Sequence, residues 1–219
     1  MKNKLTTIYV VRHGESEGNL RMVYSENSEL GSPLTETGKL QAKKAAEKFK
    51  EIDLAAIFSS DMTRAHQTAE VIALEKGLEV NTTNLIRERS FYQYLKKLPQ
   101  KSEEELKAEI IYGLLKLDTK GKMKYKHTEA MESAAGGATR LLTFIREAAS
   151  AYEGKTIMVV CHGDIMRSLL THLGYAEYDE LPHGSIDNTG YFILESDGVD
   201  FFIKETVGIN KQEGITRDF

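Results

Sequence analysis

Short runs of β-branched and aromatic residues alternate along the chain with longer segments in which apolar positions recur at helical spacing. Residues 8–11 (Ile-Tyr-Val-Val) predict a buried strand, and residues 55–58 and 156–161 predict two more. A shorter run at 78–80 predicts a further strand. Because strands and helices alternate, the pattern indicates an α/β fold: a three-layer α/β/α sandwich with a mostly parallel central sheet.

Capping residues and glycines mark the ends of the helices between these strands. Thr35 is a suitable N-cap for the first helix. Ser60 or Asp61 is expected to cap the next helix, which ends at Gly77 because glycine favours the left-handed conformation after a helix. Three more helices are expected at residues 103–117, 129–152 (with the weak point Gly136-Gly137) and 164–173.

Two segments depart from the alternation of strands and helices. Apolar runs at 191–194 and 199–203 flank Asp197-Gly198, which predicts a hairpin and therefore one antiparallel edge strand. Residues 118–126 are rich in lysine and are expected to form an exposed loop. We interpret this loop and the helix before it as an insertion over the main sheet.

Length and charge limit the possible classes of protein. A chain of 219 residues is long enough for one domain with a substantial core, so we expect a single domain over residues 1–219 with a helical and loop insertion at about 90–128. Lys and Arg number 29 against 33 Asp and Glu, a net charge of −4, which disfavours binding to nucleic acid. The apolar runs are far shorter than the roughly 20 residues of a membrane span, so no membrane partner is expected. The oligomeric state stays open.

Cysteine usage and the N-terminal segment suggest a compartment. Cys161 is the single cysteine, which excludes an internal disulfide framework and a multi-cysteine zinc site. No small-residue cleavage site follows residues 1–11, so we expect a strand there rather than a signal peptide. The expected location is therefore the cytoplasm.

Histidines and arginines follow three of the predicted strands. The first strand runs into Arg12 and His13, and the second is followed by Arg64 one turn into the next helix. The strand at 156–161 runs into His162. Because ligands bind at the carboxyl ends of parallel strands, we expect these side chains to converge on one crevice. Guanidinium groups fit phosphate oxygens in bidentate fashion, so the natural ligand of this crevice is a phosphate group.

The same residue types suit phosphoryl transfer. A neutral imidazole is a nucleophile toward phosphorus when its other nitrogen is held as a donor. The phosphoryl group in transfer spreads negative charge over three oxygens, which nearby cations stabilise. A leaving alkoxide needs a proton, so a carboxylic acid is expected close by.

Four motifs occur in order: residues 12–16 (Arg-His-Gly-Glu-Ser) with Asn19, residues 33–38 (Pro-Leu-Thr-Glu-Thr-Gly), residues 59–65 (Ser-Ser-Asp-Met-Thr-Arg-Ala) and residues 159–163 (Val-Val-Cys-His-Gly). Together they resemble the histidine phosphatase superfamily, which includes cofactor-dependent phosphoglycerate mutase. The resemblance covers most of the chain apart from about 90–128 and the C-terminal tail. It implies a phosphoglycerate mutase-like fold.

The resemblance also implies a catalytic set: Arg12, His13, Arg64, Glu88 and His162. His13 would be the nucleophile that becomes phosphohistidine, and the two arginines and His162 would stabilise the transferring group. Glu88 best matches the proton donor of the family. Asn19 and the backbone N–H of Gly163 would bind substrate. No metal or other cofactor is implied, because the arginines supply the charge that Mg²⁺ supplies elsewhere.

We therefore expect a metal-independent phosphomonoesterase that acts on a small phosphorylated metabolite. The alternative is a phosphoglycerate mutase, although residues 90–94 replace a Gly-rich stretch of the family and Asp164 stands where mutases tend to have Asn. A second alternative is a phospho-ligand binding module with little turnover, which depends on the assignment of Glu88. Arg87 and Arg89 flank that residue, and surface ion pairing accounts for them at least as well as substrate contact.

Overall fold

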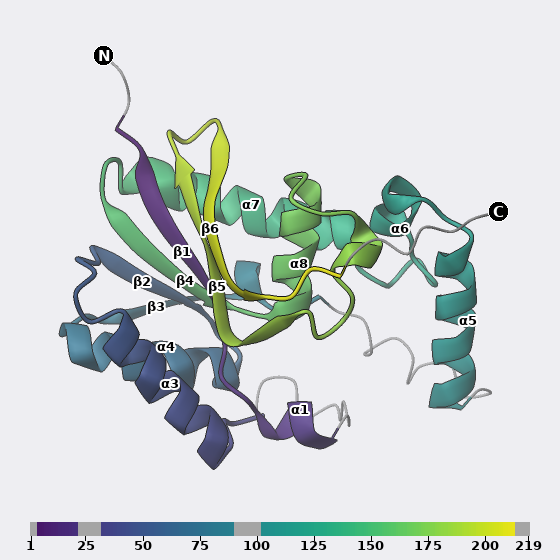
Figure 1. Cartoon of the computed structure of the whole chain (residues 1–219), viewed down its shortest axis with the longest axis horizontal. Coiled ribbons are helices and arrows are strands. Elements are labelled where there is room, and N and C mark those ends of the chain that lie inside the picture. The colour runs from purple at the N-terminus through teal and green to yellow at the C-terminus, as the bar shows by residue number, and fades with distance from the viewer. Residues whose placement is uncertain (1–3, 22–31, 90–101, 213–219) are drawn as a thin grey trace.

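A six-stranded sheet forms the centre of the computed structural model, which describes residues 4–21, 32–89 and 102–212 (Figure 1). The strand order is β3-β2-β4-β1-β5-β6. The strands are β1 (Thr6–Arg12), β2 (Ala56–Ser60), β3 (Val80–Thr83), β4 (Thr156–Cys161), β5 (Ile186–Ser196) and β6 (Phe201–Ile209). The pairs β1–β4, β4–β2 and β2–β3 are parallel, whereas β5 is antiparallel to both β1 and β6. A mostly parallel sheet with an antiparallel edge is therefore confirmed.

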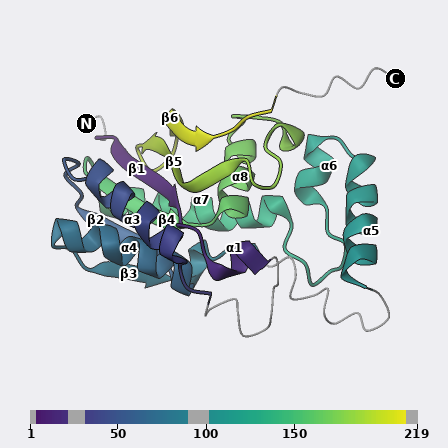
Figure 2. The same cartoon turned by 60° about the horizontal axis from the view of Figure 1, so that its bottom comes forward.

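Helices on both faces of the sheet complete the three layers (Figures 1 and 2). One face is covered by α3 (Glu36–Lys48) and α4 (Thr63–Lys76), and the other by α7 (Ala134–Ala151) and α8 (Gly163–His172). The smaller elements are α1 (Glu17–Arg21), the 3₁₀ turns η1 (Asn84–Ile86) and η3 (Tyr178–Glu180), α5 (Glu103–Leu115) and α6 (Thr119–Lys124). Across the described residues, no helix combines the length and apolarity needed to cross a bilayer.

The central strand β4 shows how the sequence supplies both core layers. Ile157, Val159 and Cys161 belong to the core under α7 and α8, whereas Met158 and Val160 belong to the core under α3 and α4. All five side chains are fully buried. Since successive side chains of a strand point to opposite faces, a strand covered on both sides is a continuous apolar run, as the sequence shows.

The parallel register brings the carboxyl ends of the strands to one edge of the sheet. Arg12 of β1 is paired with Cys161 of β4, and Ser60 of β2 is paired with Thr83 of β3. The segments that follow these four residues therefore start side by side, which is the arrangement expected from the sequence.

Three predicted boundaries were wrong. The N-cap of α4 is Met62, because Asp61 instead accepts two hydrogen bonds from Arg87, at 2.7 and 2.5 Å. Helix α7 begins after its cap Ser133, later than expected, and β3 begins at Val80. The cap at Thr35 and the left-handed Gly77 (φ 61°) agree with the expectation. The hairpin strands β5 and β6 are longer than the predicted runs.

The lysine-rich segment 118–126 was also predicted wrongly, because it contains the helix α6. Asp118 caps the helix, and Met123 packs against the buried start of α7. Lys122 is 5% exposed and forms an ion pair with Asp179. In both views α5 and α6 lie to one side of the sheet, as an insertion would (Figures 1 and 2). The first part of the predicted insertion, residues 90–101, is outside the described residues.

Candidate active site

Two histidines and an arginine meet at the carboxyl edge of the sheet. His13 directly follows β1, His162 follows β4 as the N-cap of α8, and Arg64 is the second residue of α4. The centroids of the two imidazole rings are 5.1 Å apart. Nε of Arg64 donates a hydrogen bond to Nε2 of His13 at 3.0 Å. The structure therefore brings together residues that lie far apart in the sequence.

The hydrogen bonds of His13 fix its tautomer. Nδ1 lies 2.6 Å from the carbonyl oxygen of Gly14, which can only accept, so Nδ1 carries the proton. Nε2 accepts a hydrogen bond from Arg64, so the lone pair is on Nε2 and points toward that guanidinium group. Burial lowers the pKa of His13 well below 6.5, and the charges of Arg64 and Arg12 lower it further. The ring is consequently neutral and carries its lone pair on Nε2, as a nucleophile toward phosphorus requires.

Thr68 connects this histidine loop to α4. Its hydroxyl oxygen accepts a hydrogen bond from the backbone N–H of Gly14 at 3.1 Å, and its O–H donates to the carbonyl oxygen of Arg64 at 2.8 Å. Thr68 is fully buried. Thr68 was not predicted as a site residue, although it lies four positions after Arg64 and therefore on the same helix face.

The start of β5, where its pairing with β6 is irregular, also contacts the backbone of His13. Nδ2 of Asn188 donates to the carbonyl oxygen of His13 at 3.1 Å, and the backbone N–H of Thr189 lies 3.4 Å from the same oxygen. Thr189 has a φ of 59°, the one positive φ of a non-glycine residue among the described positions. Nothing in the sequence indicated this contact, because it depends on how β5 pairs with its neighbours.

His162 has no exposed surface, and neither ring nitrogen has a hydrogen-bond partner within the part of the chain that the structure describes. Burial lowers the pKa of this histidine well below 6.5, and the charges of Arg64 and then of His13 and Arg12 contribute. Because buried polar atoms are normally paired, the two nitrogens of this neutral ring are suited to contact a ligand between His162 and the arginines.

Arg12 lies against the first turn of α8. It is the last residue of β1, and its guanidinium donates to the carbonyl oxygen of Ile186. A Cβ atom on Gly163 would lie 3.1 Å from Nε of Arg12, so glycine makes room for this side chain. Asn19 is exposed in α1, and its oxygen accepts from the backbone N–H of Ser16 at 3.1 Å. The substrate contacts of Asn19 and Gly163 stay predictions.

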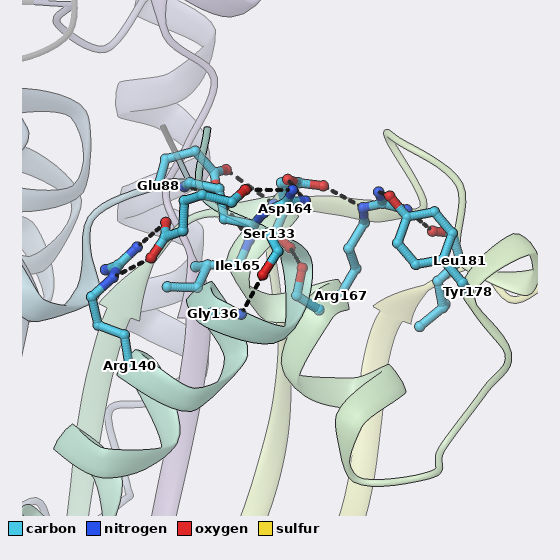
Figure 3. Close-up of polar contacts among 12 residues, drawn as sticks. Glu88, Ser133, Gly136, Arg140, Asp164, Ile165, Arg167, Tyr178 and Leu181 are labelled. Carbon is cyan, nitrogen blue, oxygen red and sulfur yellow. Dashed lines mark hydrogen bonds and ion pairs between the residues drawn. The ribbon is translucent and has the colours of Figure 1, made fainter. Parts of the chain in front are cut away.

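Glu88 follows η1 and rests on the N-terminus of α8 (Figure 3). Its carboxylate accepts hydrogen bonds from the backbone N–H groups of Asp164 at 3.0 Å, Ile165 at 2.8 Å and Arg89 at 2.9 Å. Burial raises the pKa of Glu88, and the charge of Asp164 raises it further. A carboxyl group with a raised pKa can donate a proton near neutral pH.

Arg89 forms an ion pair, which was one of the two roles left open for it, but this pair is buried rather than on the surface. Its side chain is 3% exposed and donates to Asp164 at 2.7 Å and to the carbonyl oxygen of Glu132 at 3.1 Å.

No cluster of three His, Cys, Asp or Glu side chains among the described residues could hold a metal ion. The site joins the neutral imidazole of His13, cationic side chains and the half-buried carboxyl group of Glu88, which together suit the transfer of a phosphoryl group.

The sequence matches the family model of the histidine phosphatase superfamily (branch 1) over residues 8–207. A probable phosphatase of Schizosaccharomyces pombe is 28% identical over 169 residues, which are 75% of this chain and 72% of that protein. Phosphoglycerate mutase-like protein 4 of Arabidopsis thaliana is 30% identical over 164 residues, 74% of this chain and 68% of the relative. The solved structure of Bacillus stearothermophilus YhfR has a TM-score of 0.72 at 25% identity and covers 90% of this chain and 95% of its own.

The match spans the strand ends that carry His13, Arg64 and His162, and it agrees with the shared fold. The chain belongs to the histidine phosphatase superfamily.

Proposed function

We propose that this protein hydrolyses a small phosphomonoester through a phosphohistidine formed on His13, without a metal ion. The observation that carries the proposal is the fixed tautomer of His13, whose Nε2 lone pair faces Arg64 at 3.0 Å. The name of the probable phosphatase among the relatives supports hydrolysis as the reaction class. The nitrogens of His162, which have no hydrogen-bond partner among the described residues, support a phosphoryl site between the two histidines.

The proposed reaction has two steps. Nε2 of His13 attacks phosphorus, the ester P–O bond breaks, and Glu88 gives its proton to the leaving oxygen. Glu88 then removes a proton from water, the water oxygen attacks phosphorus, and the P–N bond breaks. His13 is again neutral, Glu88 is again protonated, and inorganic phosphate leaves. Arg12 and Arg64 stabilise the charge on the phosphoryl oxygens in both steps.

Hydrolysis of p-nitrophenyl phosphate in the presence of EDTA tests this proposal. We expect activity in the native chain and its loss in His13→Ala, with an acid-labile phosphoryl group trapped on His13 after rapid quenching. A phosphoryl label on another side chain, or turnover with no label, would overturn the proposal. A native chain that binds inorganic phosphate but turns over no ester would instead be a phospho-ligand binding module.

The alternative enzyme is a phosphoglycerate mutase. The name of the mutase-like relative of Arabidopsis thaliana supports this alternative. A mutase must retain the phosphoryl group and exclude water, whereas a phosphatase must admit water. Residues 90–94, which led us to favour the phosphatase, lie outside the described residues. Incubation with 3-phosphoglycerate and its bisphosphate primer separates the two activities. Formation of the isomer faster than release of phosphate would overturn the phosphatase.

A further inference from the structure

Glu88 is surrounded by neutral donors although a cation follows it directly in the chain. Its carboxylate contacts the backbone N–H groups of Arg89, Asp164 and Ile165, and among the described residues it forms no ion pair. The guanidinium of Arg89 turns instead to Asp164. Asp164 also binds the guanidinium of Arg167 one turn further along α8 (Figure 3).

We propose that Asp164 is a positioning residue for the acid Glu88. Its carboxylate keeps Arg89 from pairing with Glu88, and it fixes the first turn of α8, whose N–H groups hold the acid. This inference rests on the proposed role of Glu88 as the proton donor.

The competition for Arg89 decides which carboxylate stays charged. A carboxylate paired with a guanidinium is stabilised in its ionised form, so an Arg89–Glu88 ion pair would remove the acid from use. Burial opposes ionisation of Asp164, but the guanidinium groups of Arg167 and Arg89 outweigh it and hold its pKa well below its usual range. The negative charge of Asp164 in turn opposes ionisation of Glu88.

Both the backbone and the side chain of Asp164 are held by hydrogen bonds. Its backbone N–H donates to Glu88 while its side chain joins Arg89 and Arg167, each with less than a tenth of its surface exposed. Arg167 is fixed further by a hydrogen bond to the hydroxyl of Tyr178 at 2.8 Å. A rotation of the Asp164 side chain would break its contacts to both arginines. These contacts therefore hold the first turn of α8 in place, together with the backbone N–H groups that bind Glu88.

Other charged and titratable groups lie on the elements packed around Glu88. Arg64 of α4 favours its ionised form and opposes the effect of Asp164. Burial raises the pKa of the Cys161 thiol of β4, so this group stays neutral. Arg140 of α7 is paired with Glu132 through two hydrogen bonds, at 2.9 and 2.8 Å. Among the residues that the structure describes, Asp164 is thus the anionic group that favours the protonated form of Glu88.

The pH dependence of kcat/KM for glycerol 2-phosphate tests the proposal, because its alkoxide leaving group needs a proton. Asp164→Asn keeps the shape of the side chain but removes its charge and releases Arg89. The alkaline limb is expected to move to lower pH by about one unit, the usual effect of losing a nearby like charge. Arg89→Met leaves Asp164 charged with one cation fewer, and its limb is expected to move to higher pH. Activity on p-nitrophenyl phosphate, a good leaving group, should change less.

Asp179→Asn is the matched control, because it breaks an ion pair to the buried Lys122 without touching Glu88. Its alkaline limb should coincide with that of the native chain. Glu88→Gln should abolish the limb in the native background. If it does not, the assigned acid is wrong and the proposed mechanism fails rather than the inference about Asp164.

Two results would overturn the role of Asp164. One is an alkaline limb that keeps its position in Asp164→Asn while the overall rate falls, which is what loss of packing alone produces. The other is displacement of the limb in the same direction by Asp164→Asn and Arg89→Met. If Asp164→Asn does not fold, as judged by circular dichroism, the direction of the shift in Arg89→Met decides the question.

Discussion

Nε of Arg64 donates a hydrogen bond to Nε2 of His13 at 3.0 Å, so a cation contacts the lone pair that the proposed reaction uses. The contact aims the ring toward the site and helps to keep it neutral. During phosphoryl transfer the same N–H group would turn from the imidazole to a phosphoryl oxygen. The proposed nucleophile is thus held ready by the group that later stabilises its product.

Replacement of Arg64 should therefore remove a hydrogen-bond donor to His13 as well as a positive charge. We expect Arg64→Met to lower kcat/KM for p-nitrophenyl phosphate by about 10²–10³-fold, the usual effect of removing one donor to a developing oxyanion. Arg64→Lys keeps the charge but lacks the planar fork, so its activity should lie between the two. Steady-state rates measure both effects. A lysine variant as active as the native chain would show that charge alone is needed.

The two buried histidines should make stability depend on pH. Burial, with the nearby arginines, holds the pKa of His13 and of His162 well below 6.5, so both rings take up protons on unfolding in acid. Their contribution is complete above the unfolded pKa and is lost as pH falls toward the folded pKa. Each histidine should lower the free energy of unfolding by up to about 1.4 kcal/mol per pH unit below pH 6.5.

Urea unfolding at several pH values between 7.5 and 5 measures this dependence. His13→Gln lacks one of the two titrating rings, so its slope should be smaller by about 1.4 kcal/mol per pH unit. Glu88, with its raised pKa, acts in the opposite direction in both proteins and cancels in the comparison. Equal slopes would mean that His13 is protonated in the folded state or is accessible to water.

The meeting of His13 and His162 could be predicted because each follows a buried apolar strand, and parallel strands place their carboxyl ends at one edge. The alternating apolar runs predicted most of the strands and helices. The cap at Thr35 and the glycine at Gly77 predicted where two of the helices begin and end. These features are local in sequence, or they follow from a general rule about parallel sheets. They need no knowledge of a particular distant partner.

Features that depend on distant partners could not be predicted. Arg89 has the sequence context of a surface residue, and its burial follows from Asp164, 75 positions later. Lys122 similarly pairs with Asp179, 57 positions away, which turns an apparently exposed lysine loop into a packed helix. The left-handed Thr189 gives no signal at all in a strand-like sequence. Such contacts are visible only once the elements are packed.

Thr189 carries backbone strain beside His13. Its φ of 59° is unfavourable for a β-branched residue, whereas asparagine tolerates this conformation. Thr189→Asn should therefore raise the free energy of unfolding by about 1 kcal/mol, as measured in urea. Thr7→Asn in the extended strand β1 is the control and should lower it, because β-branched residues favour strands. Destabilisation by Thr189→Asn would show that the threonine hydroxyl, which donates to Asn188, outweighs the strain.

Two adjacent glycines in α7 distinguish close packing from helix propensity. A Cβ atom on Gly137 would lie 2.7 Å from Cγ of Arg89, in the middle of a buried side chain that Asp164 holds. Alanine normally stabilises a helix by about 1 kcal/mol relative to glycine, but here overpacking should destabilise the protein by about 1–3 kcal/mol. A Cβ atom on Gly136 would lie 3.3 Å from Oγ of Ser133, so Gly136→Ala should be neutral or stabilising. Thermal unfolding compares the two, and equal melting temperatures would contradict the packing of Arg89 across α7.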